Sequence, residues 1–378
     1  MIIPQIIESE QPLSSADENA KRGDNSKYNF TVPQGRFLVV DDIPVNIRVV
    51  AGMLSTYKAA VDTCPGGAEA IEFVKRNTYD IVFMDHMMPG IDGIEATAVI
   101  REWEKENERS PVTIVALTAN AVAGVREMFL ENGFNDFLAK PVEIFKLGEI
   151  IARWIPKEKI EKPVSGGGQQ AQADEQDGWE EAFSSISNLD VKRGIARTGG
   201  TIENYFSVLS MFCRDTEERL PVFQTVPDAD TLSFFTTQAH AIKSAAASIG
   251  AGEVSSKAAA LEAAGRAGDL PKIEENLSGF AAELKELNAG IQKAIMSHNE
   301  MKQPRSGENV SPALESLLRE LKEALASKKA TSDIFNILNE MNKVGLDKEN
   351  RDFLEKISYH VLMGEFEDAA KIADKFKS

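Results

Sequence analysis

Acidic side chains stand directly after short apolar runs in the first half of the chain. Asp41 and Asp42 follow one such run, and Asp85 follows another. Thr118 and Lys140 close or follow two later runs. Three carboxylates in one cleft repel each other, and Mg²⁺ relieves that repulsion because it prefers oxygen ligands and bridges carboxylates to phosphate. The spacing therefore predicts a site for Mg²⁺ and a phosphoryl group, provided that the fold brings these side chains together.

The chemistry predicted for this cluster is phosphoryl transfer to a carboxylate. Asp85 is expected to attack phosphorus and form an acyl phosphate, while Asp41 and Asp42 hold the metal. The charge on the transferring oxygens must be met by a cation and by a hydrogen-bond donor. We expect Lys140 to pair with one phosphoryl oxygen and Thr118 to donate a hydrogen bond to another.

A histidine in the second half of the chain offers a second chemistry. His240 lies in a stretch, 231–250, whose apolar residues recur at three- and four-residue steps and predict one amphipathic helix. A neutral imidazole is a good nucleophile near neutral pH, and Lys243, one turn onward, can stabilise phosphate charge. The small residues Ser244 and Ala247 leave room for a partner domain. The pattern predicts a phosphorylated histidine rather than a metal ligand, since no second ligand stands at metal-site spacing.

Five short apolar runs, separated by helix-length stretches, must position the acidic cluster. This alternation predicts an α/β domain with a doubly wound, five-stranded parallel sheet that is covered on both faces. In such sheets the working site lies at the carboxyl ends of the strands, so the polar groups should meet at one edge. The runs are Phe37–Val40, Ala59–Val61, Ile81–Met84, Thr113–Leu117 and Asp136–Ala139.

The rest of the chain consists of helical segments and polar breaks. Helical periodicity after the first domain predicts an all-α bundle around His240 and a small helical segment at the C-terminal end. The polar, non-periodic stretches predict a disordered leader and two linkers. The predicted organisation is a leader (1–34), an α/β domain (35–156), a flexible linker (157–178), a helical domain (179–297), a second linker (298–311) and a helical C-terminal module (312–378).

Composition and charge exclude several classes of protein. Of the 378 residues, 43% are hydrophobic and 27% are charged, which is ordinary for two or three globular domains. A formal net charge of −17 disfavours binding to nucleic acid or to an anionic membrane surface. No apolar stretch is long enough to span a bilayer, and the first residues lack a secretory signal. We therefore expect a cytoplasmic protein, with Cys64 and Cys213 as free thiols.

The α/β segment, residues 35–156, closely resembles the response-regulator receiver family, which has a flavodoxin-like fold. The resemblance implies that Asp85 is the phosphoacceptor and that Thr118, Phe137 and Lys140 are the residues that respond to phosphorylation. It rests on the motifs VVDDIPVN (39–46), FMDHMMPGIDG (83–93), ALTAN (116–120) and FLAKP (137–141). The Mg²⁺ ligands that it implies are Asp41, Asp42, Asp85 and the backbone carbonyl of Met87.

The helical segment, from 179 to about 296, resembles the histidine-containing phosphotransfer (HPt) family, a four-helix bundle with an exposed histidine. The match centres on AHAIKSAAASIGA (239–251), and LEAAGRAGD (261–269) follows it. It implies that His240 is a phosphoacceptor and that Lys243 supports it. The family often has glycine at the position of Ser244, and serine is still small enough to permit docking.

Together the two resemblances imply a two-component phosphorelay protein whose partners are a sensor histidine kinase and a downstream response regulator. This domain order is usual at the tail of hybrid sensor kinases, so both a free-standing relay and a separated part of such a kinase fit. Because no ATP-binding glycine-rich motif is found, we expect a carrier rather than a kinase. Two other functions stay open: a sink that hydrolyses phosphate at Asp85, and an interaction protein switched by phosphorylation.

Overall fold

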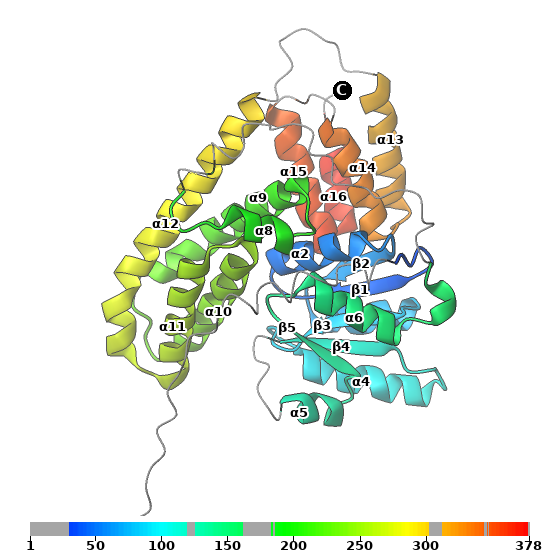
Figure 1. The fold of residues 1–378 in the computed structure, drawn as a ribbon, viewed down its shortest axis with the longest axis horizontal. Helices are drawn as coiled ribbons and strands as arrows, with labels where there is room; N and C mark the ends of the chain where they lie inside the picture. The colour runs from blue at the N-terminus through cyan, green and yellow to red at the C-terminus, as the bar shows by residue number, and fades with distance from the viewer. Residues whose placement is uncertain are drawn as a thin grey trace, which may run out of the picture.

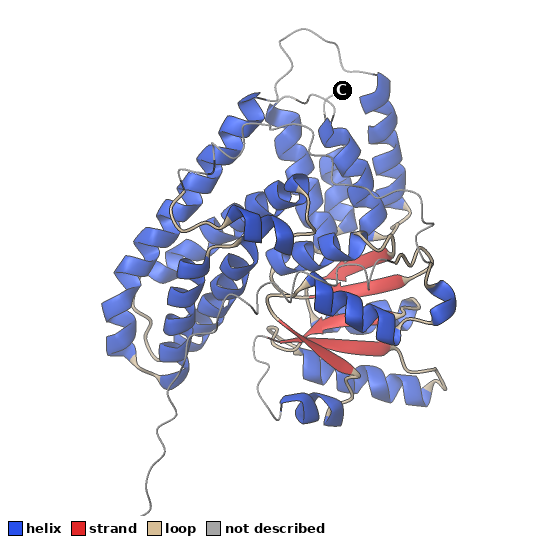
Figure 2. Ribbon diagram, in the orientation of Figure 1, coloured by secondary structure: helices blue, strands red, loops and turns tan. Residues whose placement is uncertain are grey.

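Five parallel strands form the centre of the N-terminal unit in this computed structural model (Figure 2). Their order, β2-β1-β3-β4-β5, confirms the predicted doubly wound sheet. The strands are β1 (Arg36–Val40), β2 (Ala60–Cys64), β3 (Ile81–Asp85), β4 (Thr113–Thr118) and β5 (Asp136–Ala139). The second strand runs further than predicted because it pairs with β1 as far as Val40 and Cys64. The structure describes residues 30–118, 125–161, 183, 186–301, 312–343, 346 and 348–376.

Helices cover both faces of this sheet. Successive side chains of a strand point to opposite faces, so Phe37 and Val39 join one core while Leu38 and Val40 join the other. This burial on both sides is typical of a parallel sheet. The first core includes α2 (Pro44–Ser55) and α6 (Ile144–Trp154), and the second includes α3 (Gly67–Arg76), α4 (Gly93–Glu106) and α5 (Val125–Glu131).

A four-helix bundle follows the sheet domain and confirms the predicted all-α segment. Three aromatic rings fill its centre: Phe223 packs edge-on against Phe235 and Phe280, with ring centroids 5.5 and 5.1 Å apart. The last helix extends to Met301, so the predicted second linker, 298–311, begins inside a helix. The bundle consists of α9 (Ile202–Arg219), α10 (Leu232–Ile249), α11 (Gly252–Ala267) and α12 (Leu270–Met301), preceded by α8 (Val191–Arg197).

Four further helices form the C-terminal module, as the sequence predicted. Figure 1 shows them beside α2 and β2, on the side of the sheet away from α4 and α5. Leu321, Ile334 and Ile357 are completely buried among them. These helices are α13 (Pro312–Ala326), α14 (Thr331–Lys343), α15 (Lys348–Leu362) and α16 (Phe366–Ala373).

Helix α2 is buried on all sides. Every residue from Pro44 to Leu54 is buried, including the polar Asn46 and Arg48. A helix that is apolar around its whole circumference must be covered around its whole circumference. The sheet covers one side, and α9, α10 and α15 contact the others. The three units therefore share one continuous apolar core, with α2 at its centre (Figure 1).

The α/β domain begins earlier in the chain than predicted. Phe30 and Val32 are buried in the core, and Thr31 forms an antiparallel bridge with Glu161. These apolar side chains exclude residues 30–34 from the predicted disordered leader. Residues 157–159, predicted as linker, form a 3₁₀ turn. The remaining leader residues, 1–29, and most of both linkers lie outside the described residues.

Two expectations from composition can also be compared with the structure. Cys64 and Cys213 are both buried and unbridged, as predicted. Burial raises the pKa of both thiols, which keeps them protonated. None of the helices in the described ranges has both the length and the apolar character that crossing a membrane requires.

Candidate functional site

The carboxyl ends of β1 and β3 bring three aspartates together. Carboxylate oxygens of Asp41, Asp42 and Asp85 all lie within 4.8 Å of one another. Asp41 is completely buried and Asp85 is 1% exposed, while Asp42 is half-buried. The parallel sheet thus places the acidic residues in one cleft, where the sequence had predicted them.

Lys140 lies between two of these carboxylates. Its Nζ is 2.5 Å from Asp41 Oδ2 and 2.6 Å from Asp85 Oδ2. Burial acts to lower the pKa of Lys140, but Asp41 and Asp85 outweigh it and raise that pKa above its ordinary value. Burial likewise acts to raise the pKa of Asp85, and Lys140 and His86 outweigh it and lower that pKa. Asp85 is therefore ionised, as a carboxylate nucleophile must be.

One lysine cannot balance three carboxylates, and the pKa values of the other two aspartates show this. Burial, together with repulsion from the other carboxylates, raises the pKa of Asp41, and it raises the pKa of Asp42 to about 7. Asn46 Nδ2 and the Ile43 N–H each donate to Asp41 Oδ1 at 3.0 Å and fix its orientation. Three crowded oxygen donors with excess negative charge fit a divalent cation such as Mg²⁺.

The remaining residues implied by the receiver resemblance are the Met87 backbone, Thr118 and Phe137. The Met87 N–H donates to Asp85 Oδ1 at 3.4 Å, which places the Met87 backbone beside the nucleophile. Thr118 ends β4 and is 1% exposed. Phe137 on β5 is half-buried and stacks on Phe129, with ring centroids 6.5 Å apart. The roles of these side chains as metal shell and switch stay predictions.

The second candidate nucleophile, His240, lies on α10 among three charged residues. Its Nδ1 is 2.9 Å from Glu262 Oε1 on α11. Lys243 Nζ donates to Glu262 Oε2 at 2.6 Å, and Arg266 donates to Glu262 Oε1 at 2.7 Å. Gly265 allows this approach of the two helices, because a side chain there would collide with Thr236. One carboxylate is thus held by two cations and contacts the imidazole.

Glu262 selects the nucleophilic nitrogen of His240. Burial acts to raise the pKa of Glu262, but hydrogen bonds from His240, Lys243 and Arg266 outweigh it and lower that pKa well below its usual range. An ionised carboxylate can only accept, so Nδ1 carries the proton. Lys243 Nζ is also 3.3 Å from Nδ1, but its shorter bond is to Glu262. The lone pair therefore resides on Nε2.

The structure corrects one expectation about this histidine. The family resemblance implied an exposed side chain, whereas His240 is only 7% exposed. The reason is the tertiary packing around α10: α11 packs beside it, and α2 of the sheet domain also contacts it. Sequence reasoning also missed Glu262 and Arg266. The available signal was an acidic residue next to Leu261 on a helix of small residues, with an arginine four positions later.

Side chains from the two candidate sites touch at two places. Ser244, one turn after His240, donates through Oγ to Asn46 Oδ1 at 3.2 Å, and Asn46 in turn holds Asp41. On the other side, Arg266 Nη2 lies 3.8 Å from Met87 Sδ, two residues after Asp85. The helix that carries His240 therefore packs against the rim of the Asp85 cleft.

The electrostatic influence of the Asp85 cleft extends to an arginine of the bundle. Burial acts to lower the pKa of Arg219, but the hydrogen bond and charge of Asp215 and the nearby charge of Asp42 raise it. The charge of Asp42 thus reaches α9 of the bundle. The predicted docking surface around Ser244 is occupied by the chain's own sheet domain.

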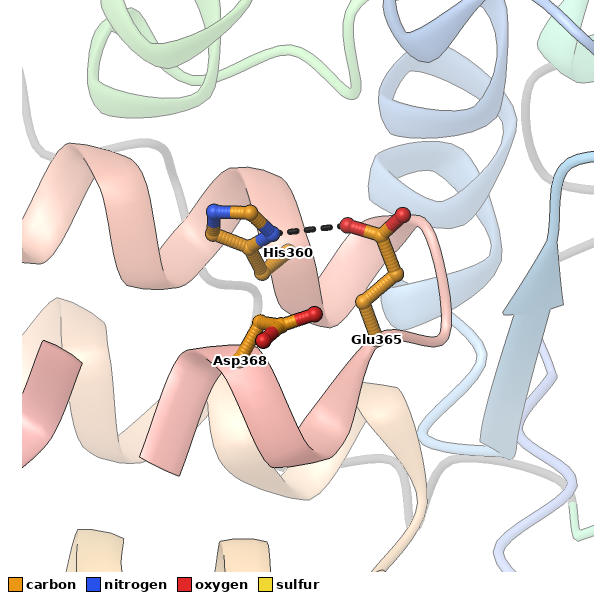
Figure 3. A group of neighbouring side chains, drawn as sticks. All are labelled: His360, Glu365 and Asp368. Carbon is orange, nitrogen blue, oxygen red and sulfur yellow. Dashed lines mark hydrogen bonds and ion pairs between the residues drawn. The ribbon is translucent and has the colours of Figure 1, made fainter. Parts of the chain in front are cut away.

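Another group of potential metal ligands lies in the C-terminal helices (Figure 3). His360 Nδ1 is 2.7 Å from Glu365 Oε2, and the Glu365 N–H donates to the His360 carbonyl at 2.8 Å. Asp368 pairs with Lys371 at 2.7 Å. These contacts close the turn between α15 and α16, and we interpret the group as structural.

Comparison with protein families decides what the two units are. Residues 37–152 match the response regulator receiver domain, and residues 207–291 match the Hpt domain. The chain carries a receiver domain followed by an Hpt domain. The Asp85 cleft lies in the receiver domain, and His240 lies in the Hpt domain.

Curated proteins and solved structures that are similar to this chain each match only part of it. The sensor protein GacS of Pseudomonas syringae is 40% identical over 119 residues, 32% of this chain and 13% of GacS. The histidine-protein kinase BarA of Escherichia coli is 35% identical over 141 residues, 37% of this chain and 14% of BarA. The matched stretches thus span about one seventh of these kinases.

Two solved structures illustrate the similarity. The receiver domain of the sensor kinase PA1611 from Pseudomonas aeruginosa, with magnesium in its active-site cleft, is 40% identical. It covers 32% of this chain and 96% of that domain, with a TM-score of 0.29. The complex of the phosphotransfer protein Ypd1 and the receiver domain of Ssk1 from Saccharomyces cerevisiae gives 33% identity. There the match covers 32% of this chain and 88% of the other, with a TM-score of 0.31.

Proposed function

We propose that this protein is a phosphorelay carrier in which Asp85 and His240 hold the phosphoryl group in turn. The observation that supports this most is the contact between the two sites: Ser244 binds Asn46 beside Asp41, and Arg266 touches Met87 beside Asp85. Two phosphoacceptor domains in one chain, with residues beside their reactive groups in contact, fit transfer between them.

In the first step Asp85 accepts the phosphoryl group from a phosphohistidine of a sensor kinase. An oxygen of Asp85 bonds to phosphorus as the N–P bond of the donor breaks, and the electron pair stays on the leaving imidazole nitrogen. Mg²⁺ would be held by Asp41, Asp42, Asp85 and the Met87 carbonyl. Its positive charge would offset the repulsion between the three carboxylates and the phosphate. Lys140 pairs with one phosphoryl oxygen, and Thr118 donates to another.

In the second step His240 takes the group from an aspartyl phosphate, or returns it. Nε2 bonds to phosphorus as the O–P bond to Asp85 breaks, and the electron pair returns to the Asp85 carboxylate. The imidazole then carries a positive charge, which Glu262 stabilises because it already accepts from Nδ1 at 2.9 Å. Lys243 adds charge stabilisation to the phosphoryl oxygens. A downstream response regulator would be the next acceptor.

Labelling of the full chain tests this function. The protein is incubated with ³²P-labelled acetyl phosphate and Mg²⁺, quenched, digested, and each labelled peptide is identified with its acid and base stability. We expect base-labile label on the peptide with Asp85 and base-stable, acid-labile label on the peptide with His240. Rapid release of inorganic phosphate without label on His240 would instead identify a sink.

A further inference from the structure

The C-terminal helices contact both domains of the proposed relay, although none of the relay chemistry uses them. Helices α14 and α15 contact β2 and α2 of the receiver domain. Helix α15 also reaches the Hpt domain, where the Arg214 guanidinium lies 4.2 Å from the centroid of the Tyr359 ring. Figure 1 shows α15 next to α9, with α14 and α15 close to α2. The module therefore bridges the two phosphoacceptor domains.

The contact with the receiver domain closes an exposed sheet edge. β2 is an edge strand, so one row of its backbone groups needs partners. The Val61 N–H donates to Ser332 Oγ at 3.0 Å, and Thr63 Oγ1 donates to the Leu362 carbonyl at 2.7 Å. Thr63 and Thr331 are both buried there, with their hydroxyl oxygens 3.4 Å apart. These are specific polar contacts in a buried interface, not a loose apolar one.

A buried arginine joins the three units. Arg48 of α2 donates through Nε to Ser207 Oγ of the Hpt domain at 3.2 Å. Its guanidinium also lies 4.2 Å from the centroid of the Phe335 ring on α14. Arg48 is 5% exposed, and among the described residues it forms no ion pair with a carboxylate. A buried cation needs hydrogen-bond acceptors and aromatic rings around it to offset its lost hydration, and here Ser207 and Phe335 provide them. Arg48 is therefore fully accommodated only when both α9 and α14 pack against α2.

We propose that the C-terminal helices α13–α16 act as a clamp that keeps the receiver domain docked on the Hpt domain of the same chain. In the clamped state the helix of His240 lies against the rim of the Asp85 cleft, and His240 is covered. Transfer between Asp85 and His240 then occurs within one chain. A receiver from another protein reaches His240 only after the clamp releases. This consequence rests on the proposed relay function, whereas the docking can be measured without any phosphorylation.

The clamp is tested through the accessibility of His240 in the full-length protein. Diethyl pyrocarbonate modifies accessible imidazoles, and mass spectrometry gives the rate at each histidine. Ser332→Arg places a long cation at the β2 interface, and Ser316→Arg places the same cation on the exposed face of α13 as a matched control. We expect His240 to react about tenfold faster in Ser332→Arg, as a loss of about 1.4 kcal/mol of docking energy would produce, and at the wild-type rate in Ser316→Arg.

A second variant keeps the test decisive if Ser332→Arg disturbs folding, which circular dichroism would reveal. Tyr359→Ala removes the ring beneath Arg214 on the Hpt side and should also raise the reactivity of His240. Unchanged reactivity of His240 in the folded variants would overturn the clamp. If reactivity rises as expected but wild-type His240 never acquires phosphate, the clamp stands and the relay function fails.

Discussion

At the Asp85 cleft three carboxylates surround one lysine, whereas at the His240 site one carboxylate, Glu262, is held by Lys243 and Arg266. Both nucleophiles are buried, Asp85 at 1% and His240 at 7% exposure. The charge around them therefore differs much more than their access to solvent. A phosphoryl group is anionic, so the first site repels it unless a cation is added, and the second attracts it with the chain's own residues.

This difference follows from the chemistry of the nucleophiles. A carboxylate brings its own negative charge to the phosphoryl group, and a buried site must compensate for it. A neutral imidazole brings none and becomes positive when it bonds to phosphorus, so it benefits from one nearby anion. Glu262 provides that anion, and its two cationic partners prevent it from repelling the phosphate. We therefore expect metal dependence at Asp85 and none at His240.

Loss of Asp85 should have the largest effect. Asp85→Asn removes the nucleophile while keeping its shape, so labelling from acetyl phosphate should fall to background at both sites. Mass spectrometry and the base-labile label measure this. Asp42→Asn is a useful comparison, because it should weaken labelling through the metal site while leaving the nucleophile present. Undiminished label in Asp85→Asn would refute the assignment.

His240→Gln should separate the two sites. We expect wild-type labelling of Asp85 and complete loss of onward transfer to a separate response regulator, because glutamine has no nucleophilic lone pair on nitrogen. Gel assays with labelled protein and an added regulator follow both quantities. Onward transfer that persists without His240 would show that the Hpt domain is not the carrier.

Removal of the metal should distinguish the sites directly. With EDTA in place of Mg²⁺, formation of label on Asp85 should cease, because Asp41 and Asp42 then repel the incoming phosphate. Label already on His240 should not be lost faster with EDTA, since its surroundings contain their own cations and removal of Mg²⁺ also stops its return to Asp85. The decay is followed after removal of free label. Faster loss of label from His240 with EDTA would contradict the comparison.

Loss of a charged neighbour at the His240 site should be milder. Lys243→Ala leaves the nucleophile in place but removes one of two cations, so transfer should slow about tenfold, equivalent to about 1.4 kcal/mol in the barrier. Rapid-quench kinetics give the rate. Lys243→Arg retains the charge and should restore most of the wild-type transfer rate. Equal rates in Lys243→Ala and wild type would exclude a role for this cation.

The smallest expected effect is on stability against acid. The lowered pKa of Glu262 means that its ionised form stabilises the fold at neutral pH. This contribution should persist above the ordinary glutamate pKa of 4.5 and disappear as the pH falls below it towards the lowered value. Glu262→Gln imitates the protonated form, so urea unfolding should show wild type more stable at pH 7 and the two proteins converging in acid. A constant difference across that range would contradict this.

Much of the receiver domain could be predicted from its sequence. Buried parallel strands are nearly continuous apolar runs, and the residues after them must meet at one edge, which located Asp41, Asp42, Asp85 and Lys140 together. The His240 helix was equally visible from its apolar periodicity. Local patterns of this kind act within one element or between neighbours in a regular sheet.

Contacts between helices of the bundle and between domains could not be predicted in this way. Glu262 reaches His240 only because α11 packs on α10. The hydrophobic periodicity of a single helix does not show which residues of two helices will meet. The burial of His240 and the partner of Ser244 depend on docking of α2. One signal was available in α2 itself: apart from Asn46 and Arg48, the sequence PVNIRVVAGML is apolar, which predicts cover beyond the sheet. Phe30 and Val32 were similarly hidden in a polar segment.

Time-resolved transfer within the unmodified chain tests the central claim most directly. The receiver domain is labelled briefly with acetyl phosphate and Mg²⁺, excess reagent is removed, and samples are quenched while label on Asp85 and His240 is counted separately. We predict that label leaves Asp85 and appears on His240 with a single rate constant that does not change when the protein is diluted tenfold. Label that leaves Asp85 only as inorganic phosphate, or a rate that falls with dilution, would contradict transfer within one chain.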